Sequence, residues 1–307
     1  MQTISASSQL SQSIFEPLPI PARAGIGLKA QHVAEILETR ADIGFFEVHA
    51  ENYMGAGGLP HVQLTEIRNN YALSVHGVGM SIGGENPIDK EHLARFKAVV
   101  HRYEPGLISE HLAWSTHDDV FYNDLLPVPY TSETLSRVID HVDVVQSALG
   151  RQILIENPST YVIFEQSTMS EVDFMGEVAK RSGCGLLFDV NNVFVSTTNH
   201  GTSPKEYIDS YPLNLVQELH LGGHAPDEDD AGRPLLIDAH DRKIDHEVWE
   251  LYKQVLSKTG PLPSLIEWDN DVPEWPVLAE EARRADAILG RNLVDGAQSE
   301  RKLSHVS

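Results

Sequence analysis

Short apolar runs alternate with amphipathic segments along most of the chain. The runs are rich in Val, Ile, Leu and Phe and are followed by glycine or polar residues, which is typical of buried parallel strands. Strands are therefore expected at 24–28, 44–49, 72–76, 107–111, 153–157, 186–190, 216–220 and 263–267. Between them, apolar residues recur three and four positions apart, which predicts helices. These helices are expected at 32–39, 90–103, 131–149, 170–181, 247–258 and 277–289.

The repeated order of strand and helix indicates the fold. Residues 22–290 fit an α/β fold of the (β/α)8 TIM-barrel type, which needs roughly 250 residues. An open doubly wound sheet is the alternative, and it would place a site at one switch point. The barrel is favoured because every expected strand after the first has His, Glu or Asp at or next to its end, and a barrel brings all these ends to one mouth. Residues 1–21 are expected to form a flexible arm, residues 112–130 a long loop and residues 291–307 a polar tail.

Composition and charge narrow the possible partners. The 307 residues include 45 acidic and 23 basic side chains, which gives a formal charge of −22. This charge repels nucleic-acid phosphates and anionic lipids, so no nucleic-acid or membrane partner is expected. The single cysteine, Cys184, excludes an internal disulfide and is interpreted as a buried core thiol. Since no signal-like or membrane-spanning segment is found, a soluble cytoplasmic protein is predicted.

The expected strand ends and the segment 218–240 are dense in side chains that bind metals. Asp238 and His240 are two positions apart, so in an extended segment both would face the same ion. One His or Glu at a strand end is more often an ordinary loop or capping residue. Gathered at one mouth, however, so many carboxylates could not stay ionised without cations. The candidate ligands are His49, His76, Glu156, Asp189, His220, Asp238, His240 and Glu267, with Glu51, Glu110, His111, Asn191, Asn192 and His224 beside them.

This ligand set is larger than one ion requires, and it therefore predicts two or three ions. Imidazole and carboxylate ligands without a thiolate are compatible with iron, manganese or zinc. Tyr53, Tyr130 and Tyr161 follow the expected strands and are interpreted either as the lining of a substrate groove or as packing residues.

Motifs distributed over residues 22–290 indicate a family. They are GIGLK, EVHAENYMGAGG, SVHGVGMSIGG, ISEHLAWS, NDLLPVPYT, LIENPSTYV, GCGLLFDVNNVFVSTTNHG, ELHLGGH, IDAH, VWELY and LIEWD. In combination they resemble the multinuclear non-heme iron-dependent oxidative enzymes, whose best-known member is the catalytic subunit of methanobactin biosynthesis.

The resemblance implies a xylose-isomerase-like TIM barrel that holds two or three irons. It implies an enzyme that uses O₂ to modify a cysteine of a ribosomally made precursor peptide, with a partner protein that binds the leader. By position, the implied iron ligands are His49, His76, Glu156, Asp189, Asn191, His220, Asp238, His240 and Glu267. Glu156, Asp189 and Asp238 are also expected to act in catalysis.

Two other functions stay open. One is a divalent-metal-dependent hydrolase or sugar isomerase, in which two ions activate water or hold oxygens of the substrate. Abasic-site endonucleases of the same barrel superfamily carry Asp-x-x-His where this chain has Asp189-Val190-Asn191-Asn192, and this difference disfavours the endonuclease interpretation. The other is a metal-storing or scaffold protein without catalysis.

Overall fold

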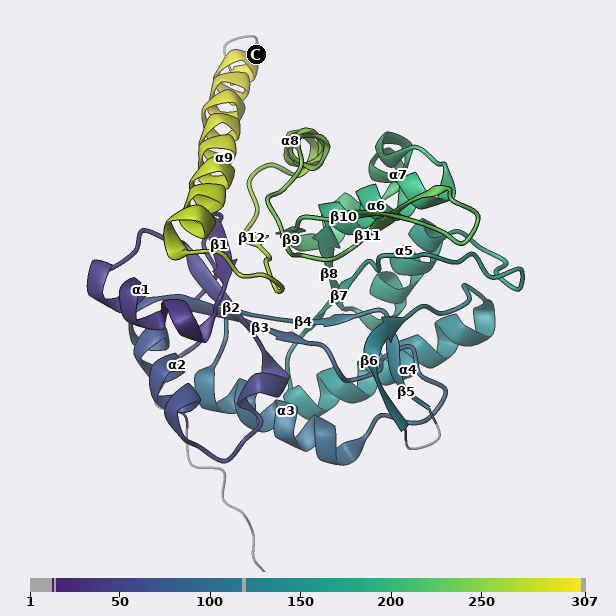
Figure 1. Cartoon of the computed structure of the whole chain (residues 1–307), viewed down its shortest axis with the longest axis horizontal. Coiled ribbons are helices and arrows are strands. Elements are labelled where there is room, and N and C mark those ends of the chain that lie inside the picture. The colour runs from purple at the N-terminus through teal and green to yellow at the C-terminus, as the bar shows by residue number, and fades with distance from the viewer. Residues whose placement is uncertain (1–12, 14, 118–119, 305–307) are drawn as a thin grey trace, which may run out of the picture.

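Eight parallel strands close into a barrel that is surrounded by helices (Figure 1). The computed structural model describes residues 13, 15–117 and 120–304, with the side chains of residues 13, 15–117 and 120–290. Around the barrel the strands are β1 Ala24–Gly27, β12 Ser264–Ile266, β9 Val216–Leu221, β8 Gly185–Asp189, β7 Leu154–Glu156, β4 Leu107–His111, β3 Ala72–Gly77 and β2 Phe45–His49. Each of the eight expected strands is present, and the closed barrel confirms the predicted TIM-barrel fold.

Helices follow most of the strands and cover the outside of the barrel. They are α1 Val33–Thr39, α2 Leu59–Asn70, α3 Lys90–Tyr103, α4 Ser132–Leu149, α5 Glu171–Ser182, α6 Val190–His200, α7 Pro204–Ser210, α8 His246–Thr259 and α9 Trp275–Ser304. Short 3₁₀ helices lie at Ala30–His32, Ala50–Tyr53 and Leu213–Leu215. The sequence pattern predicts six of these α-helices but not α2, α6 or α7. In α2 the buried face includes His61 and Arg68, which interrupt the apolar periodicity.

The two faces of each strand have different roles. Phe46 and Val48 of β2 belong to the apolar core between the strands and the helices. The alternate residues turn into the barrel. There the ring of Phe45 fills the space beside Gly25, at which a Cβ would lie 2.5 Å from the ring. Glu47 comes next and His49 reaches the mouth, so the interior changes from apolar to polar along the barrel axis.

Two antiparallel hairpins extend from the barrel, where the sequence pattern indicates only loops. β5 Trp114–His117 pairs with β6 Val120–Leu126, and β10 Ala225–Glu228 pairs with β11 Pro234–Ile237. The long loop expected at 112–130 is therefore wrong in its central part. β6 is exposed along most of its length, so it lacks the alternation by which half-buried strands are recognised.

The terminal segments are partly packed on the barrel. Residues 1–12 and 14 of the expected arm lie outside the described residues, but Phe15 stacks on Tyr103 and lies beneath the guanidinium of Arg68. At the other end, α9 continues from the barrel through residues 291–304, where the sequence suggests a polar tail (Figure 1). Among the described residues, no helix is both long enough and apolar enough to cross a membrane.

Candidate metal centre

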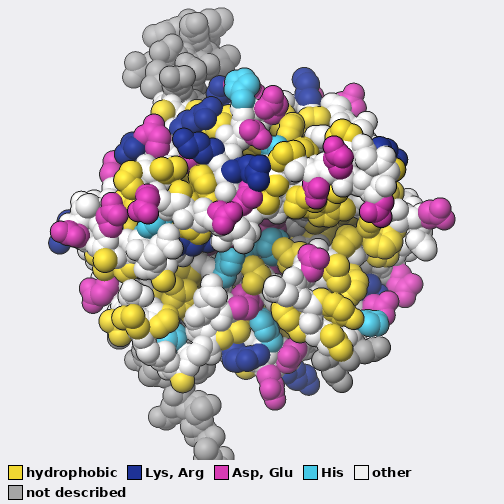
Figure 2. All heavy atoms as spheres, in the orientation of Figure 1, with side chains coloured by type: hydrophobic (Ala, Val, Ile, Leu, Met, Phe, Trp, Pro, Cys, Tyr) yellow, Lys and Arg dark blue, Asp and Glu magenta, His cyan; other side chains and the backbone are white. Residues whose placement is uncertain are grey.

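The candidate ligands meet at the end of the barrel where the parallel strands finish. Strand pairing holds three pairs of them side by side: His49 and His76, His111 and Glu156, and Asp189 and His220. Figure 2 shows histidine and acidic side chains at the centre of this face, with hydrophobic side chains around them. The barrel thus brings together residues that are more than 200 positions apart in the sequence.

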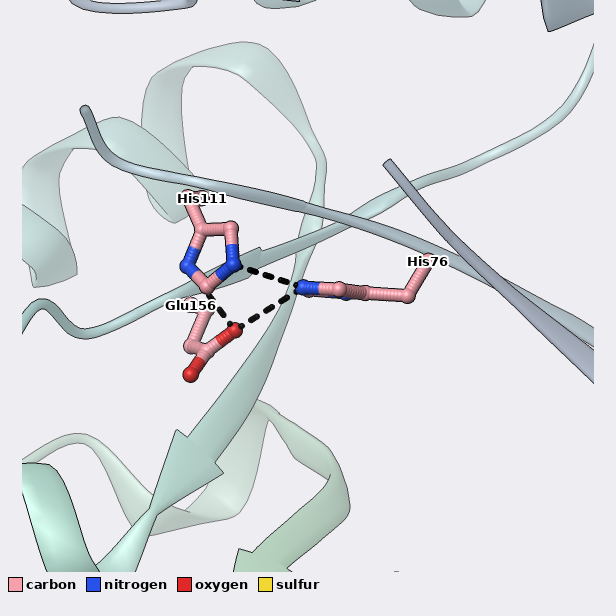
Figure 3. Close-up of side chains that lie close together, drawn as sticks. All are labelled: His76, His111 and Glu156. Atoms are coloured by element: carbon pink, nitrogen blue, oxygen red, sulfur yellow. Dashed lines mark hydrogen bonds and ion pairs between the residues drawn. The ribbon is translucent and has the colours of Figure 1, made fainter. Parts of the chain in front are cut away.

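Side chains from β3, β4 and β7 form the first group (Figure 3). Nε2 of His76 lies 2.8 Å from Nε2 of His111 and 3.4 Å from Oε2 of Glu156. Nδ1 of His111 lies 3.2 Å from the same oxygen. Ser109 Oγ contacts Nδ1 of His76 at 2.7 Å and so fixes the orientation of this ring. Two imidazoles and one carboxylate are the ligand set of many non-heme iron sites.

His220 is the centre of the second group. Its Nδ1 lies 3.1 Å from Oε2 of Glu267, and its Nε2 lies 3.3 Å from Oε1 of Glu47. Glu218 is deeper in the barrel, where its Oε2 accepts a hydrogen bond from Ser74. Glu47, Glu218 and His220 offer ligand atoms within 4.8 Å of one another, and so do Glu156, Asp189 and His220. The groups are therefore joined through shared residues rather than separate.

The junction of β8 and α6 fixes Asp189. Its Oδ1 accepts a hydrogen bond of 2.6 Å from the backbone N–H of Asn192 and so caps the helix, while its buried Oδ2 has no hydrogen-bond partner. Asn192 donates from Nδ2 to Oε1 of Glu156 at 3.1 Å, and its buried Oδ1 also has no partner. Asn191 instead donates to Asp238 at 2.6 Å and contacts His224 at 2.9 Å. Of the two amides, Asn192 therefore has the freer oxygen, while Asn191 stays a predicted ligand.

Asp238 and His240 converge, but not through the extended backbone that the sequence analysis expects. Both lie beyond β11, and His240 has a φ of 45°, in the left-handed region. Backbone hydrogen bonds hold it there, since its N–H donates to Gly223 and its carbonyl accepts from Asp269 and Asn270. Nε2 of His240 lies 2.8 Å from Oδ1 of Asp238, and its Nδ1 lies 3.6 Å from Oε2 of Glu267.

Gly222 is required for this arrangement because its backbone touches the His240 ring. A Cβ at Gly222 would lie 2.4 Å from Nε2 and Cδ2 of that ring. We expect Gly222→Ala to displace His240 and lower the metal content, while circular dichroism still shows a folded barrel. Gly176→Ala is the control, because a Cβ there meets only Pro212 at 3.7 Å. An unchanged metal content in Gly222→Ala would show that His240 is not needed for metal binding.

Burial makes part of the site neutral. It lowers the pKa of His111 to about 4, and burial together with the neighbouring imidazoles lowers the pKa of His76 well below its usual value. Burial, aided by neighbouring carboxylates, raises the pKa of Glu156 well above its usual value. For Asp189, burial and then Asp238 raise the pKa to about 7. Without cations, these residues therefore resist carrying charge.

Another part of the site is an ion network. Burial opposes protonation of His220, but Glu47 and Glu267 outweigh it and raise the His220 pKa well above its usual value. Burial also opposes protonation of His240, whose pKa is raised well above its usual value by Asp238 and Glu267. Burial would raise the pKa of Glu267, yet the two imidazoles lower it well below its usual value. Protons on the histidines thus balance carboxylates in the place of metal ions.

Unpartnered polar atoms show that the donor set fits metal ions. Buried atoms of the site that form no hydrogen bond are Oε2 of Glu47, Oε2 of Glu156, Oδ2 of Asp189, Oδ1 of Asn192, Oε1 of Glu218, Nε2 of His220 and Nε2 of His240. Each such atom costs roughly 1–3 kcal/mol when it stays unpaired. All of them are oxygen or imidazole nitrogen donors, which bind first-row divalent metals. The site is thus better suited to several cations than to any uncharged occupant.

Four residues at the site escape the sequence analysis as ligands or partners of ligands. They are Glu47, Glu218, Asp269 and Lys29. Three of them lie two positions from a predicted ligand: Glu47 from His49, Glu218 from His220 and Asp269 from Glu267. The two-residue period of a strand puts such neighbours on one face, so this signal could have found them. Lys29 is located only by its contact of 2.5 Å with Oδ1 of Asp269.

Two cavities open onto the centre. The larger, of about 420 Å³, reaches His111, Glu156, Asp238 and His240. The smaller, of about 350 Å³, contains Lys29 and Glu47, and His49, Glu267 and Asp269 separate the two.

The three tyrosines have different places. Tyr161 lines the larger cavity and Tyr53 the smaller one. Tyr130 is a packing residue, because its hydroxyl donates to Glu171 at 2.6 Å and its ring packs against Phe174.

Cys184 lies apart from the centre, at the start of β8. It is buried, and burial raises the pKa of its thiol to about 11, in agreement with the predicted core thiol.

Relatives with similar sequences extend over nearly the whole chain. A UPF0276 protein of Rhizobium meliloti (strain 1021) is 52% identical over 286 residues, which are 93% of this chain and 93% of the relative. A UPF0276 protein of Caulobacter vibrioides (strain NA1000 / CB15N) is 44% identical over 283 residues, 92% of this chain and 99% of the relative.

Solved structures share the fold at low sequence identity. D-psicose 3-epimerase from Clostridium cellulolyticum H10 superposes with a TM-score of 0.54 at 15% identity, covering 88% of this chain and 99% of the epimerase. Endonuclease IV from Thermus thermophilus gives a TM-score of 0.53 at 13% identity, covering 89% and 99%. A xylose isomerase-like TIM barrel protein from Mycobacterium smegmatis, in complex with magnesium, gives 0.55 at 14% identity, covering 85% and 89%. These likenesses confirm the xylose-isomerase-like barrel and indicate nothing further about the reaction.

One family model matches residues 23–290, which is nearly the whole barrel and its surrounding helices. Its description is "RiPP precursor modification enzyme MbnB/TglH/ChrH", where RiPP denotes a ribosomally synthesised and post-translationally modified peptide. The match and the relatives together establish that this chain belongs to the MbnB/TglH/ChrH family of RiPP precursor modification enzymes.

Proposed function

We propose that this protein is an iron-dependent enzyme that uses O₂ to modify a cysteine of a ribosomally made precursor peptide. The observation that carries the proposal is the joined group of imidazoles and carboxylates at the mouth, in a chain whose family modifies RiPP precursors. His76, His111 and Glu156 form a ligand set that is suited to non-heme iron.

The shared ligands support a centre of two or three ions. Glu156 belongs to groups with both His76 and Asp189, and Glu267 to groups with both His49 and Asp189. Bound iron would supply the redox chemistry, because no side chain of the site can exchange electrons with O₂ by itself. We further propose that Glu156, Asp189 and Asp238 take part in catalysis, since the first two join the groups and the third lines the larger cavity.

The chain's own residues would position the substrate and keep the site dry. The cavity of about 420 Å³ admits a cysteine side chain with neighbouring backbone, and Glu156 in its lining is fully buried. Asn191, which holds Asp238, and Ser109, which holds His76, keep the ligands in place before the substrate arrives. A preorganised, largely buried centre of this kind limits side reactions with water.

A metal-dependent hydrolase or sugar isomerase is the competing function, and the metal identity distinguishes it. We expect anaerobically purified protein to contain two or three irons per chain, and to consume O₂ when a cysteine-containing precursor peptide is added. A peptide with Ser in the place of Cys is the control and should support no uptake. Zinc alone, without O₂ uptake, would contradict the oxidase and favour a hydrolytic centre.

We also propose a partner protein that binds the leader of the precursor. The described barrel and its loops provide no separate peptide-binding domain, which is the support from this chain for the proposal. The same O₂-uptake assay therefore includes arms with and without the proteins encoded by adjacent genes. Turnover by the enzyme alone at the full rate would refute the requirement for a partner.

A further inference from the structure

Exposed hydrophobic side chains gather beside the metal centre. Of the described residues, the large hydrophobic side chains exposed elsewhere are Leu18, Leu59, Val62 and Val144. The others lie on two segments, β6 and the loop after β7, and together we name them the apolar ledge. The ledge consists of Val120, Phe121, Tyr122, Leu125, Tyr161, Val162 and Ile163. Ile163 is 72% exposed and Phe121 61%, which is unusual for such residues without a partner.

The ledge is continuous with the site. Phe121, Leu125 and Tyr161 line the larger cavity together with Glu156 and His240. The hydroxyl of Tyr161 accepts a hydrogen bond of 2.9 Å from the backbone N–H of Asp238. A molecule that lies on the ledge would therefore reach the candidate ligands without leaving the surface.

The hairpin that carries the ledge is irregular where it meets the cavity. The pair Thr116–Phe121 is followed by the pair Trp114–Leu126, so residues 122–125 lie opposite Ser115 alone. As a result Asn123, Asp124 and Leu125, which are consecutive, all line the cavity. An uninterrupted strand would direct alternate residues away from it, and bulges of this kind occur next to active sites.

One edge of β6 has no neighbour among the described strands. The sheet contains only β5 and β6, and it is not joined to the barrel sheet. A two-stranded hairpin is marginally stable by itself, and a third strand can pair with its edge through main-chain hydrogen bonds. An extended peptide provides this strand, and apolar side chains at alternate positions of the peptide would meet the ledge.

We infer that the apolar ledge binds an extended segment of the peptide substrate next to the cysteine that enters the cavity. The inference rests on the proposed function and names the surface that selects the substrate. It commits to a peptide with aromatic or aliphatic side chains two positions apart. Recognition by charge is not part of it, because the side chains of the ledge carry none.

The test is a binding selection with defined peptides. Displayed random peptides of about 12 residues, roughly 40 Å when extended, each with one central cysteine, are selected anaerobically on the metal-loaded enzyme. We expect the enriched peptides to carry apolar residues at alternate positions beside the cysteine. Phe121→Ser and Ile163→Ser should each weaken a selected, fluorescently labelled peptide roughly tenfold. Val144→Ser removes an exposed apolar side chain from α4 and should change the Kd by less than about twofold.

The outcomes separate the ledge from the chemistry. Equal affinities for the wild type and both ledge variants, or no enriched peptide, would overturn the ledge, whether or not the enzyme consumes O₂. Weaker binding by the ledge variants would support it even if no O₂ is consumed, in which case the oxidase proposal alone fails. Self-association that Phe121→Ser abolishes would also overturn it, because a second copy would then be the occupant.

Discussion

Glu156→Gln is expected to lose most of the bound metal while the barrel stays folded. Glu156 belongs to two groups of candidate ligands, one with His76 and His111 and one with Asp189 and His220. A change in a residue that only supports a ligand already weakens metal binding about 10–100-fold, so the loss of a shared ligand should weaken it by at least roughly 100-fold. Metal analysis of the purified variant measures the effect directly.

The folded barrel should tolerate this change because of the protonation state of Glu156. Burial raises its pKa well above the usual value, so the metal-free protein holds a neutral carboxyl group, which glutamine resembles in shape and charge. The melting temperature of the metal-free variant should therefore not fall. Glu165→Gln is the control, since it makes the same substitution at an exposed position. A full metal complement in Glu156→Gln would show that Glu156 is not a primary ligand.

His220→Ala is expected to lose metal and also to destabilise the metal-free protein. His220 contacts Glu47 and Glu267, all three are buried, and its removal leaves two carboxylates without their cation. Removal of one partner from a buried ion pair costs about 3 kcal/mol or more. Thermal unfolding of the chelator-treated proteins measures this loss, which the glutamine variant of Glu156 should not show.

The loss should also depend on pH. The pKa of His220 in the folded protein is raised well above its usual value of 6.5, so its stabilisation is fully present below about pH 6.5 and is lost as the pH rises through the folded pKa. The difference between the wild type and His220→Ala should thus shrink between about pH 6 and pH 9. His141→Ala is the control, because the Nδ1 of that buried ring contacts the Ile82 carbonyl oxygen and not a carboxylate. A difference that does not change with pH would mean that His220 contributes packing alone.

The sequence predicts the barrel well because each strand is an apolar run with clear ends. All eight runs become strands, and α3 begins and ends at the predicted residues, Lys90 and Tyr103. The pattern fails where burial is not apolar. The buried face of α6 includes Asn191, Asn192 and Ser196, which serve the site and not the core. The β5–β6 hairpin is missed because its side chains have no buried face to alternate with.

For the site, the sequence predicts which residues meet but not how they are held. Strand ends bring His49 next to His76 and Asp189 next to His220, as a barrel requires. The left-handed backbone of His240 depends instead on hydrogen bonds with Gly223 and Asp269, which are distant in the chain. Roles of the individual residues in binding iron stay predictions until the metal is measured.

The position of Glu267 has a consequence for the synthesis of the protein. Glu267 directly follows β12, the last strand of the barrel, and β12 closes the barrel by pairing with β1 and β9. Ligand groups that include His49, Asp189 and His240 all need this residue. A chain that is still emerging from the ribosome therefore lacks a complete centre until its final β–α unit is made. Metal capture is thus a late event in maturation, and a loaded centre reports that the first and last strands have met.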